Sequence, residues 1–427
     1  MTSRGLLTVP PPRIVGVGPE RIRRGASATG DALGTAALCI VAFLAAESPS
    51  WAMSYGGPLA CAAVILTSRL PHLRAPDLFA LVTAGWAYAT RLWTVDAAYS
   101  SISAPQYASA CLVFLAVRHV VRSTRQILAI GCAYLLGCVT AVDTVMRHAS
   151  SGVALARDNA LDYSVRFGVD GVNYNYTAYT FVTGALIALV LVRLRPSPRA
   201  VRVCLLACLP VLALGVLLNG TKGATIALAL AAVYLPLSVM APRSMRVFAG
   251  VTTPVLLVLV PLGVFSDAWM LWFDDLFGRR TGDLSGRLEI WPVALSSWLE
   301  APITGIGAGG FAAFHGIGPH TLLLTLGNDL GLVGMVLYAG TFATALAAPL
   351  VRSVPPIQRL AGLFLIALLP IWLTGHWESS QGAWILLGLL SRLQPQHLDD
   401  TYRKGVGDGD RQSPPPSGIS PFTPDRS

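Results

Sequence analysis

The chain has 427 residues, of which 54% are hydrophobic and only 12% are charged, and its mean hydropathy is +0.60. So small a charged fraction cannot hydrate the surface of a soluble protein of this size, which excludes a cytosolic enzyme, a disordered chain and a secreted disulfide scaffold. The net charge of +9 does not indicate a nucleic-acid partner, because the basic residues lie in short clusters between apolar runs. The composition therefore predicts a polytopic membrane protein.

The apolar runs predict an all-α fold, a transmembrane helix bundle of about 12 spans. We expect the spans at about 32–48, 51–68, 77–93, 104–121, 126–145, 174–194, 200–218, 223–241, 246–266, 321–350, 357–374 and 377–392. The first run follows an arginine-bearing lead without a small-residue cleavage site, so we expect it to be retained as a helix.

Basic residues set the orientation of such a bundle, because they are retained on the cytoplasmic side. With the N-terminus inside, 23 of the 31 Lys and Arg residues fall in inner segments and eight in outer ones. We therefore expect both termini in the cytoplasm.

The same pattern divides the chain into five parts. These are a cytoplasmic N-terminal tail at 1–31, spans 1–9 at 32–266, a large outer loop at 267–320, spans 10–12 at 321–394 and a disordered cytoplasmic tail at 395–427. The outer loop opens with tryptophan and phenylalanine on one helical face and acids on the other, which is typical of a helix lying in the headgroup layer.

Cations on the outer side oppose the topology signal, so they are candidates for a function. Lys222 lies in a short outer turn, 218–224, just before the eighth span, where a helix N-terminus adds to its positive field. This arrangement would bind an anion. The alternative is that Lys222 extends to water for solvation alone.

Arg287 and Trp291 lie one helical turn apart in the outer loop. A guanidinium group can hold a phosphate through two parallel hydrogen bonds. It can equally stack on the indole ring of Trp291. The residues alone leave both readings open.

His320 directly precedes the tenth span on the outer side. Imidazole titrates near neutrality, so His320 is either a general base for a hydroxyl group or an ordinary surface histidine. Asp329 is nine residues further, roughly 13 Å deeper and on the opposite helix face. It therefore cannot orient His320 directly, and a carboxylate at that depth needs a partner.

Two other motifs carry no cofactor chemistry. The glycine-rich stretch at 302–311 has no preceding strand and no following Lys-Ser/Thr, so we reject a nucleotide site and expect a compact loop. The seven cysteines lie in apolar runs without metal-ligand spacing. We expect neither a metal nor a cofactor.

The second half of the chain, about 173–392, resembles the O-antigen ligase and O-antigen polymerase superfamily of bacterial membrane glycosyltransferases. Four stretches carry the resemblance, in the same order and on the same side of the membrane: 219–224 (Asn-Gly-Thr-Lys-Gly-Ala), 286–291 (Gly-Arg-Leu-Glu-Ile-Trp), 302–311 and 320–331. Three positions depart from the family pattern. Lys222 stands in place of Arg, Thr321 in place of Asn and Asp329 in place of Glu.

The resemblance implies an enzyme of the bacterial inner membrane that transfers a glycan from a polyprenyl-diphosphate lipid to an acceptor hydroxyl on the outer face. It implies an inverting, metal-independent reaction, with a glycan or a lipid-linked glycan as acceptor and no nucleic acid. His320 and Arg287 would be catalytic, and Lys222, Arg287 and Trp291 would bind the substrate. Ligase and polymerase activities are not separated by these motifs.

Two other functions fit a polytopic membrane protein. A transporter or flippase is expected to carry ionisable residues paired through the membrane interior. A structural assembly protein would not need the outer cations. Because the polar candidates gather at the outer surface, the sequence favours transfer chemistry there.

Overall fold

The computed structural model describes residues 19–67, 72–152, 156–157, 165–169, 172–194, 198–263, 287–375 and 377–398. Within these ranges, the side chains of residues 19–28, 156–157, 165, 262–263 and 287–288 are not described. The expected interfacial helix at the start of the outer loop and most of the expected C-terminal tail lie outside the described residues.

The described chain is a bundle of helices, which confirms the predicted all-α class. Its helices are α1 (Pro19–Glu47), α2 (Pro49–Leu66), α3 (Ala75–Ala89), α4 (Ala97–Val120), α5 (Thr124–Ser151), α6 (Tyr174–Val192), α7 (Arg199–Asn219), α8 (Lys222–Met240), α9 (Pro242–Gly263), α11 (Arg287–Glu300), α12 (Gly310–His315), α13 (Leu322–Ala347), α14 (Pro355–Thr374) and α15 (Gln381–Arg392). Short helices η1 (Thr90–Leu92), η2 (Ala348–Arg352) and η3 (Pro395–His397) follow α3, α13 and α15. Strands β1 (Ala156–Arg157) and β2 (Val165–Arg166) form one short antiparallel pair.

Nine of the described helices are long and apolar enough to cross a membrane, which identifies a multi-pass membrane protein. The other three predicted spans are also helical, as α2, α3 and α15, but they do not meet the same length and hydropathy criterion. The total of 12 membrane crossings therefore stays a prediction.

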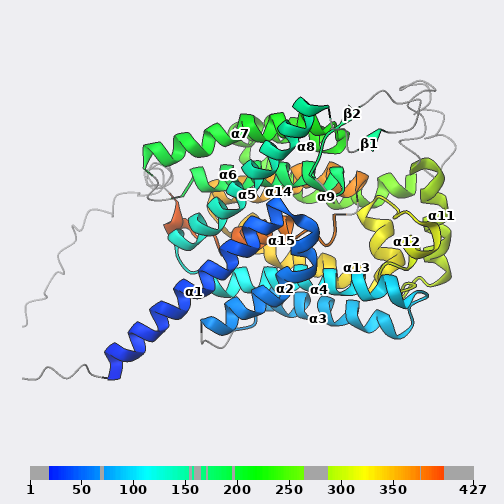
Figure 1. The fold of residues 1–427 in the computed structure, drawn as a ribbon, viewed down its shortest axis with the longest axis horizontal. Helices are drawn as coiled ribbons and strands as arrows, with labels where there is room; N and C mark the ends of the chain where they lie inside the picture. Colours follow the sequence, from blue (N-terminus) through cyan, green and yellow to red (C-terminus); the bar gives the residue numbers. More distant parts are fainter. Residues whose placement is uncertain are drawn as a thin grey trace, which may run out of the picture.

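Figure 1 shows α13 and α15 running through the middle of the bundle, with α11, α12 and the strand pair gathered at one end. Helices α13, α14 and α15 follow one another through short connections, so the start of α13, the end of α14 and the start of α15 lie at that same end. We call it the His320 end, because His320 immediately precedes this part of α13. The prediction places it on the outer side of the membrane.

Large aromatic rings fill the centre of the bundle. Trp384 of α15 is 1% exposed and packs edge-on against Tyr338 and Phe342 of α13 and Phe114 of α4. Edge-to-face packing of this kind adds to the burial of apolar area. It fixes α15 between α4 and α13, and so it fixes the hairpin that joins α14 to α15.

Helix α13 is broken in its middle at Gly331, which has φ 64° and ψ −170°. The loop before α13 satisfies the backbone groups freed by this break. Ile306 N–H donates to the Asn328 carbonyl at 2.7 Å, and Leu332 N–H donates to the Pro302 carbonyl at 2.9 Å. Such a break at membrane depth is stable only when protein covers it.

Candidate functional site

His320 has a strained backbone at the start of α13. Its φ of 56° is the only positive φ of a residue other than glycine within the described ranges. A left-handed backbone costs such a residue roughly 1–2 kcal/mol, so the surroundings must hold it in place. The side chain is half-buried, and its Nδ1 atom is shielded from solvent.

Helix α11 contacts the residue before His320. The Trp291 ring is 2% exposed, and its Nε1–H donates to the carbonyl of Pro319, one residue before His320, at 2.9 Å. A second link joins the same two helices, because Asn328 Nδ2 of α13 donates to the Ala294 carbonyl of α11 at 2.8 Å. An apolar cluster that includes Trp291 and Ala294 therefore joins this helix to the bundle, where it packs against Phe311 and Leu324.

Arg287 is the first residue of α11 and lies one turn before Trp291. Residues four apart share one helix face. The helix that begins with Arg287 is thus fixed beside His320 by the Trp291 contact. The side chain of Arg287 is not described, so the choice between stacking on Trp291 and binding a phosphate stays open.

The glycine-rich loop at 302–311 packs under His320 and α11. Gly305, Gly307 and Gly309 all have positive φ values, and each lies so close to other atoms that a side chain would collide with them. The glycines are therefore explained by tight packing against α13 and the segment before α4. This agrees with the compact loop that we expected in place of a nucleotide site.

Asp329 has the partner that its depth requires. Its carboxylate is 6% exposed and accepts a hydrogen bond from the Tyr107 hydroxyl of α4 at 2.9 Å. The backbone N–H of Gly309 donates a further hydrogen bond to it. Asp329 therefore links α4, the glycine loop and α13, and it lies apart from His320 as the helical geometry predicts.

Lys222 is the first residue of α8 and its side chain is exposed. Hydrogen bonds fix the turn before it. Asn219 Nδ2 donates to the carbonyls of Phe167 and Tyr174, at 2.9 and 2.8 Å. The Thr221 hydroxyl donates to Asn219 Oδ1, so the helix N-terminus beside Lys222 is held rigidly.

The structure thus divides the candidates into two groups at one end of the bundle. Arg287, Trp291 and His320 belong to the contacts between α11 and α13. Lys222 belongs to the contacts among α6, α8 and α14. The next residue, Gly223, lies against Thr374, the last residue of α14, and against Tyr179 of α6. Both groups lie at the His320 end, because α13 begins and α14 ends there.

A family model described as O-antigen ligase matches residues 207–339 of the chain. This part of the chain is similar to the O-antigen ligase family. The matched segment begins within α7 and ends within α13, and it contains Lys222, Arg287, Trp291 and His320. The predicted resemblance is thereby confirmed for this part of the chain. A comparison with curated proteins finds no match.

Arg166 of β2 lies beside the turn that precedes Lys222, and the sequence analysis did not select it. Its side chain is only 8% exposed and its guanidinium lies over the Tyr174 ring, 4.7 Å from the ring centre. The Cγ atom of Arg166 lies 3.6 Å from the position that a Cβ atom on Gly220 would occupy. Gly220 is two residues before Lys222. It was visible in the sequence only as one of eight outer cations; its burial could not be read there.

Glu378 is a second polar residue that the sequence did not single out as a site. It lies in the hairpin between α14 and α15, within the predicted span 377–392, and is 7% exposed. Within the part of the chain that the structure describes, its Oε2 atom has no hydrogen-bond partner.

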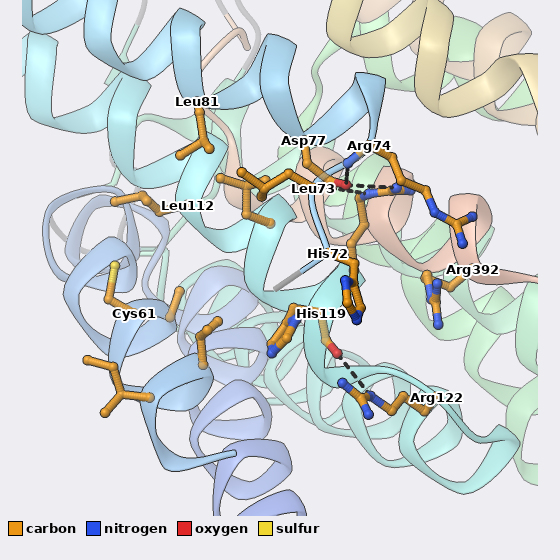
Figure 2. Close-up of a pocket in the computed structure, with 15 residues that line it drawn as sticks. Cys61, His72, Leu73, Arg74, Asp77, Leu81, Leu112, His119, Arg122 and Arg392 are labelled. Atoms are coloured by element: carbon orange, nitrogen blue, oxygen red, sulfur yellow. Dashed lines mark hydrogen bonds and ion pairs between the residues drawn. The ribbon is translucent and has the colours of Figure 1, made fainter. Parts of the chain in front are cut away.

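A cavity of about 740 Å³ lies at the other end of the bundle, between α2, α3 and α4 (Figure 2). None of the four predicted site residues lines it. It is therefore separate from the candidate site at the His320 end.

Proposed function

We propose that the protein is a membrane glycosyltransferase that transfers a glycan from a polyprenyl-diphosphate lipid to an acceptor hydroxyl on the outer face of the bacterial inner membrane. The transfer would contribute to the synthesis of envelope polysaccharide, as a ligase or a polymerase. The observation that carries the proposal is the hydrogen bond from Trp291 to Pro319, within the segment that matches the O-antigen ligase family model. It fixes the helix that starts with Arg287 beside His320.

Cations in this region would hold the diphosphate. Lys222 begins α8, so it combines its side-chain charge with the partial positive charge of a helix N-terminus. Arg287, in the first described turn of α11, would add its guanidinium. Arg166, whose side-chain stem lies beside Gly220, would add a third charge. Charges aimed at a departing diphosphate stabilise the transition state and can replace a metal ion in that role.

His320 would act as the general base. In the proposed step the acceptor oxygen attacks the anomeric carbon while the bond from that carbon to the phosphate oxygen breaks. The acceptor proton passes to the imidazole, and polyprenyl diphosphate leaves with the bonding electron pair. Attack from the side opposite the leaving group inverts the anomeric centre. The strained backbone of His320 supports this role, because strain is retained where a side chain must keep one orientation.

Trp291 would contribute by position. Its ring is buried and bonded to the loop that carries His320, so a contact with substrate would be limited to its edge. This favours a role in holding Arg287 and His320 at a fixed separation. A misplacement of about 1 Å between reacting groups can cost a hundredfold in rate.

The test is release of polyprenyl diphosphate by the full-length protein in nanodiscs. A polyprenyl-diphosphate-linked oligosaccharide is supplied with an envelope acceptor fraction, with and without EDTA. We expect release that depends on the acceptor, survives EDTA and falls at least a hundredfold in Arg287→Ala. A ladder of products would indicate a polymerase, and a single transfer a ligase.

Arg147→Ala is the matched control, because Arg147 is another arginine on the expected outer side. It is 78% exposed and pairs with Asp143 in its own helix. The control should retain activity. Equal loss in both variants, or no release with a broad panel of donors, would contradict the proposal, and the second outcome would favour the transporter.

A further inference from the structure

The cavity between α2, α3 and α4 lies at the end of the bundle away from His320. Its rim includes Arg74 just before α3, Arg118 near the end of α4, Arg122 just after α4, and Arg392, the last residue of α15. Because α15 begins at the His320 end, its last residue marks the opposite end. The distribution of basic residues predicts that this end faces the cytoplasm.

One wall of the cavity is strongly positive. Among its described lining residues, Asp77 is the single carboxylate, against four arginines and two histidines. Asp77 is already engaged. It accepts from Arg118 Nε at 2.6 Å and from the backbone N–H of Arg74 at 2.8 Å. Most of the positive charge at the cavity is therefore not neutralised by protein.

The arginines repel one another. The charges of Arg118, Arg74 and Arg122 all act unfavourably on Arg392, which is half-buried, and only Asp77 acts favourably. Arg392 is nevertheless held in place, because its Nε–H donates to the Val121 carbonyl at 3.1 Å. An anion in the cavity would remove this repulsion and would meet several guanidinium donors at once.

The other wall is apolar. Figure 2 shows Cys61, Leu81 and Leu112 on one side of the cavity, and His72, Arg122 and Arg392 on the other. Ile65 of α2, which also lines the cavity, is 74% exposed in the protein alone. In a bilayer such a side chain contacts acyl chains, so the apolar wall continues into the lipid.

We propose that this cavity binds an anionic phospholipid, with its phosphate among Arg74, Arg122 and Arg392 and its acyl chains along α2, α3 and α4. The division into a cationic and an apolar wall matches the two parts of such a lipid. Basic pockets between helices on the cytoplasmic side are a recognised form of lipid site. The volume of about 740 Å³ lies within the range of ligand pockets and accommodates a headgroup with the first part of its chains.

The experiment is native mass spectrometry of the full-length protein titrated with phosphatidylglycerol or phosphatidylcholine. The variant is Arg74→Gln with Arg122→Gln; both residues are exposed, and the backbone N–H of Arg74 that caps α3 is kept. We expect phosphatidylglycerol to bind the wild type more tightly than phosphatidylcholine does. We expect roughly thirtyfold weaker phosphatidylglycerol binding in the variant, at about 1 kcal/mol for each arginine.

The matched control is Arg125→Gln with Arg352→Gln. It removes two exposed arginines from the same end of the bundle, neither of which lines the cavity. The control should bind phosphatidylglycerol like the wild type, and both variants should melt at the wild-type temperature without added lipid.

Three results would overturn the proposal. Equal losses in both variants would mean general attraction to a basic surface. Equally tight binding of inorganic phosphate would mean a site for the headgroup charge alone. Displacement of phosphatidylglycerol by polyprenyl phosphate at lower concentration would assign the cavity to a substrate lipid. None of these results depends on whether the protein transfers glycans.

Discussion

At the scale of single residues, His320 combines strain and support. A left-handed backbone is unfavourable for histidine, yet Trp291 bonds to the residue before it and keeps the loop in place. A histidine with no role at this position would be replaced by glycine without structural cost. The strain therefore separates two properties of His320, its imidazole and its backbone, which substitutions can test independently.

We predict that His320→Ala and His320→Gly both abolish glycan transfer but differ in stability. Glycine adopts a φ of 56° freely, whereas alanine keeps the strain. The free energy of unfolding should therefore be about 1 kcal/mol higher for the glycine variant than for the alanine variant. Thermal and denaturant unfolding in detergent would measure the difference. Full transfer activity in His320→Ala would remove the imidazole from the mechanism.

Residue-scale prediction from sequence succeeds where the signal is local. Lys222 and His320 are found at helix starts as their neighbouring residues indicate. Arg166 is missed because its burial depends on a contact with the turn at Gly220. For Asp329 the sequence predicts that a partner exists, but Tyr107 lies 222 residues away and no spacing rule identifies it.

At the scale of elements, α11 and α13 act as one unit. The Trp291 and Asn328 hydrogen bonds join them at two successive levels, and the glycine loop fills the space beneath. The position of His320 relative to α11 therefore depends on side-chain contacts that can be weakened one at a time.

We predict that Trp291→Phe lowers the rate of transfer more than it lowers substrate affinity. Phenylalanine keeps an aromatic ring but loses the donor to Pro319, so the unfolding free energy should fall by roughly 1–3 kcal/mol and His320 should lose its fixed position. Trp298→Phe is the control on the same helix, since Trp298 donates to Pro302 at a longer 3.2 Å. Equal effects of the two variants on kcat would argue against the positioning role.

We predict that Gly331→Ala destabilises the protein strongly. The residue has φ 64° and ψ −170°, and a side chain there would collide with the backbone of Ile303 and Gly305. We expect a loss of more than about 2 kcal/mol. Gly85→Ala in α3 is the control, because nothing lies within 4 Å of a side chain at that position. The control should be neutral or slightly stabilising in thermal unfolding.

At the scale of the whole molecule, hydropathy predicts the helices better than it predicts which of them cross the bilayer. All 12 predicted spans are helical, yet α2, α3 and α15 fall short of the nine clear candidates. Helix α15 has only 12 residues and is nonetheless buried over most of its length, because α4, α13, α1 and α6 surround it. A helix that is surrounded by protein can be shorter than one that lies in lipid. A hydropathy window along the sequence does not detect the helices that surround it.

The orientation of the bundle gives a prediction for the intact cell. Ile317 lies at the His320 end and Ser123 between α4 and α5 at the other end, and both side chains are exposed. In a cysteine-free background, Ile317→Cys should react with a membrane-impermeant maleimide added to spheroplasts. Ser123→Cys should react only after permeabilisation. The reverse pattern would invert the predicted topology and place the candidate site on the cytoplasmic side.

The break in α13 has a consequence for how the protein is made. A helix entering lipid alone must pair all of its backbone groups internally, and α13 does not, because Gly331 interrupts it. The residues that cover the gap, 302–306, precede α13 in the chain and emerge first from the ribosome. Helix α13 therefore completes its insertion only as this earlier loop closes over it, so membrane integration of the second half and assembly of the glycine loop are a single event. For an uninterrupted helix, insertion into the membrane and tertiary folding are separate steps. For α13, the two steps occur together at Gly331.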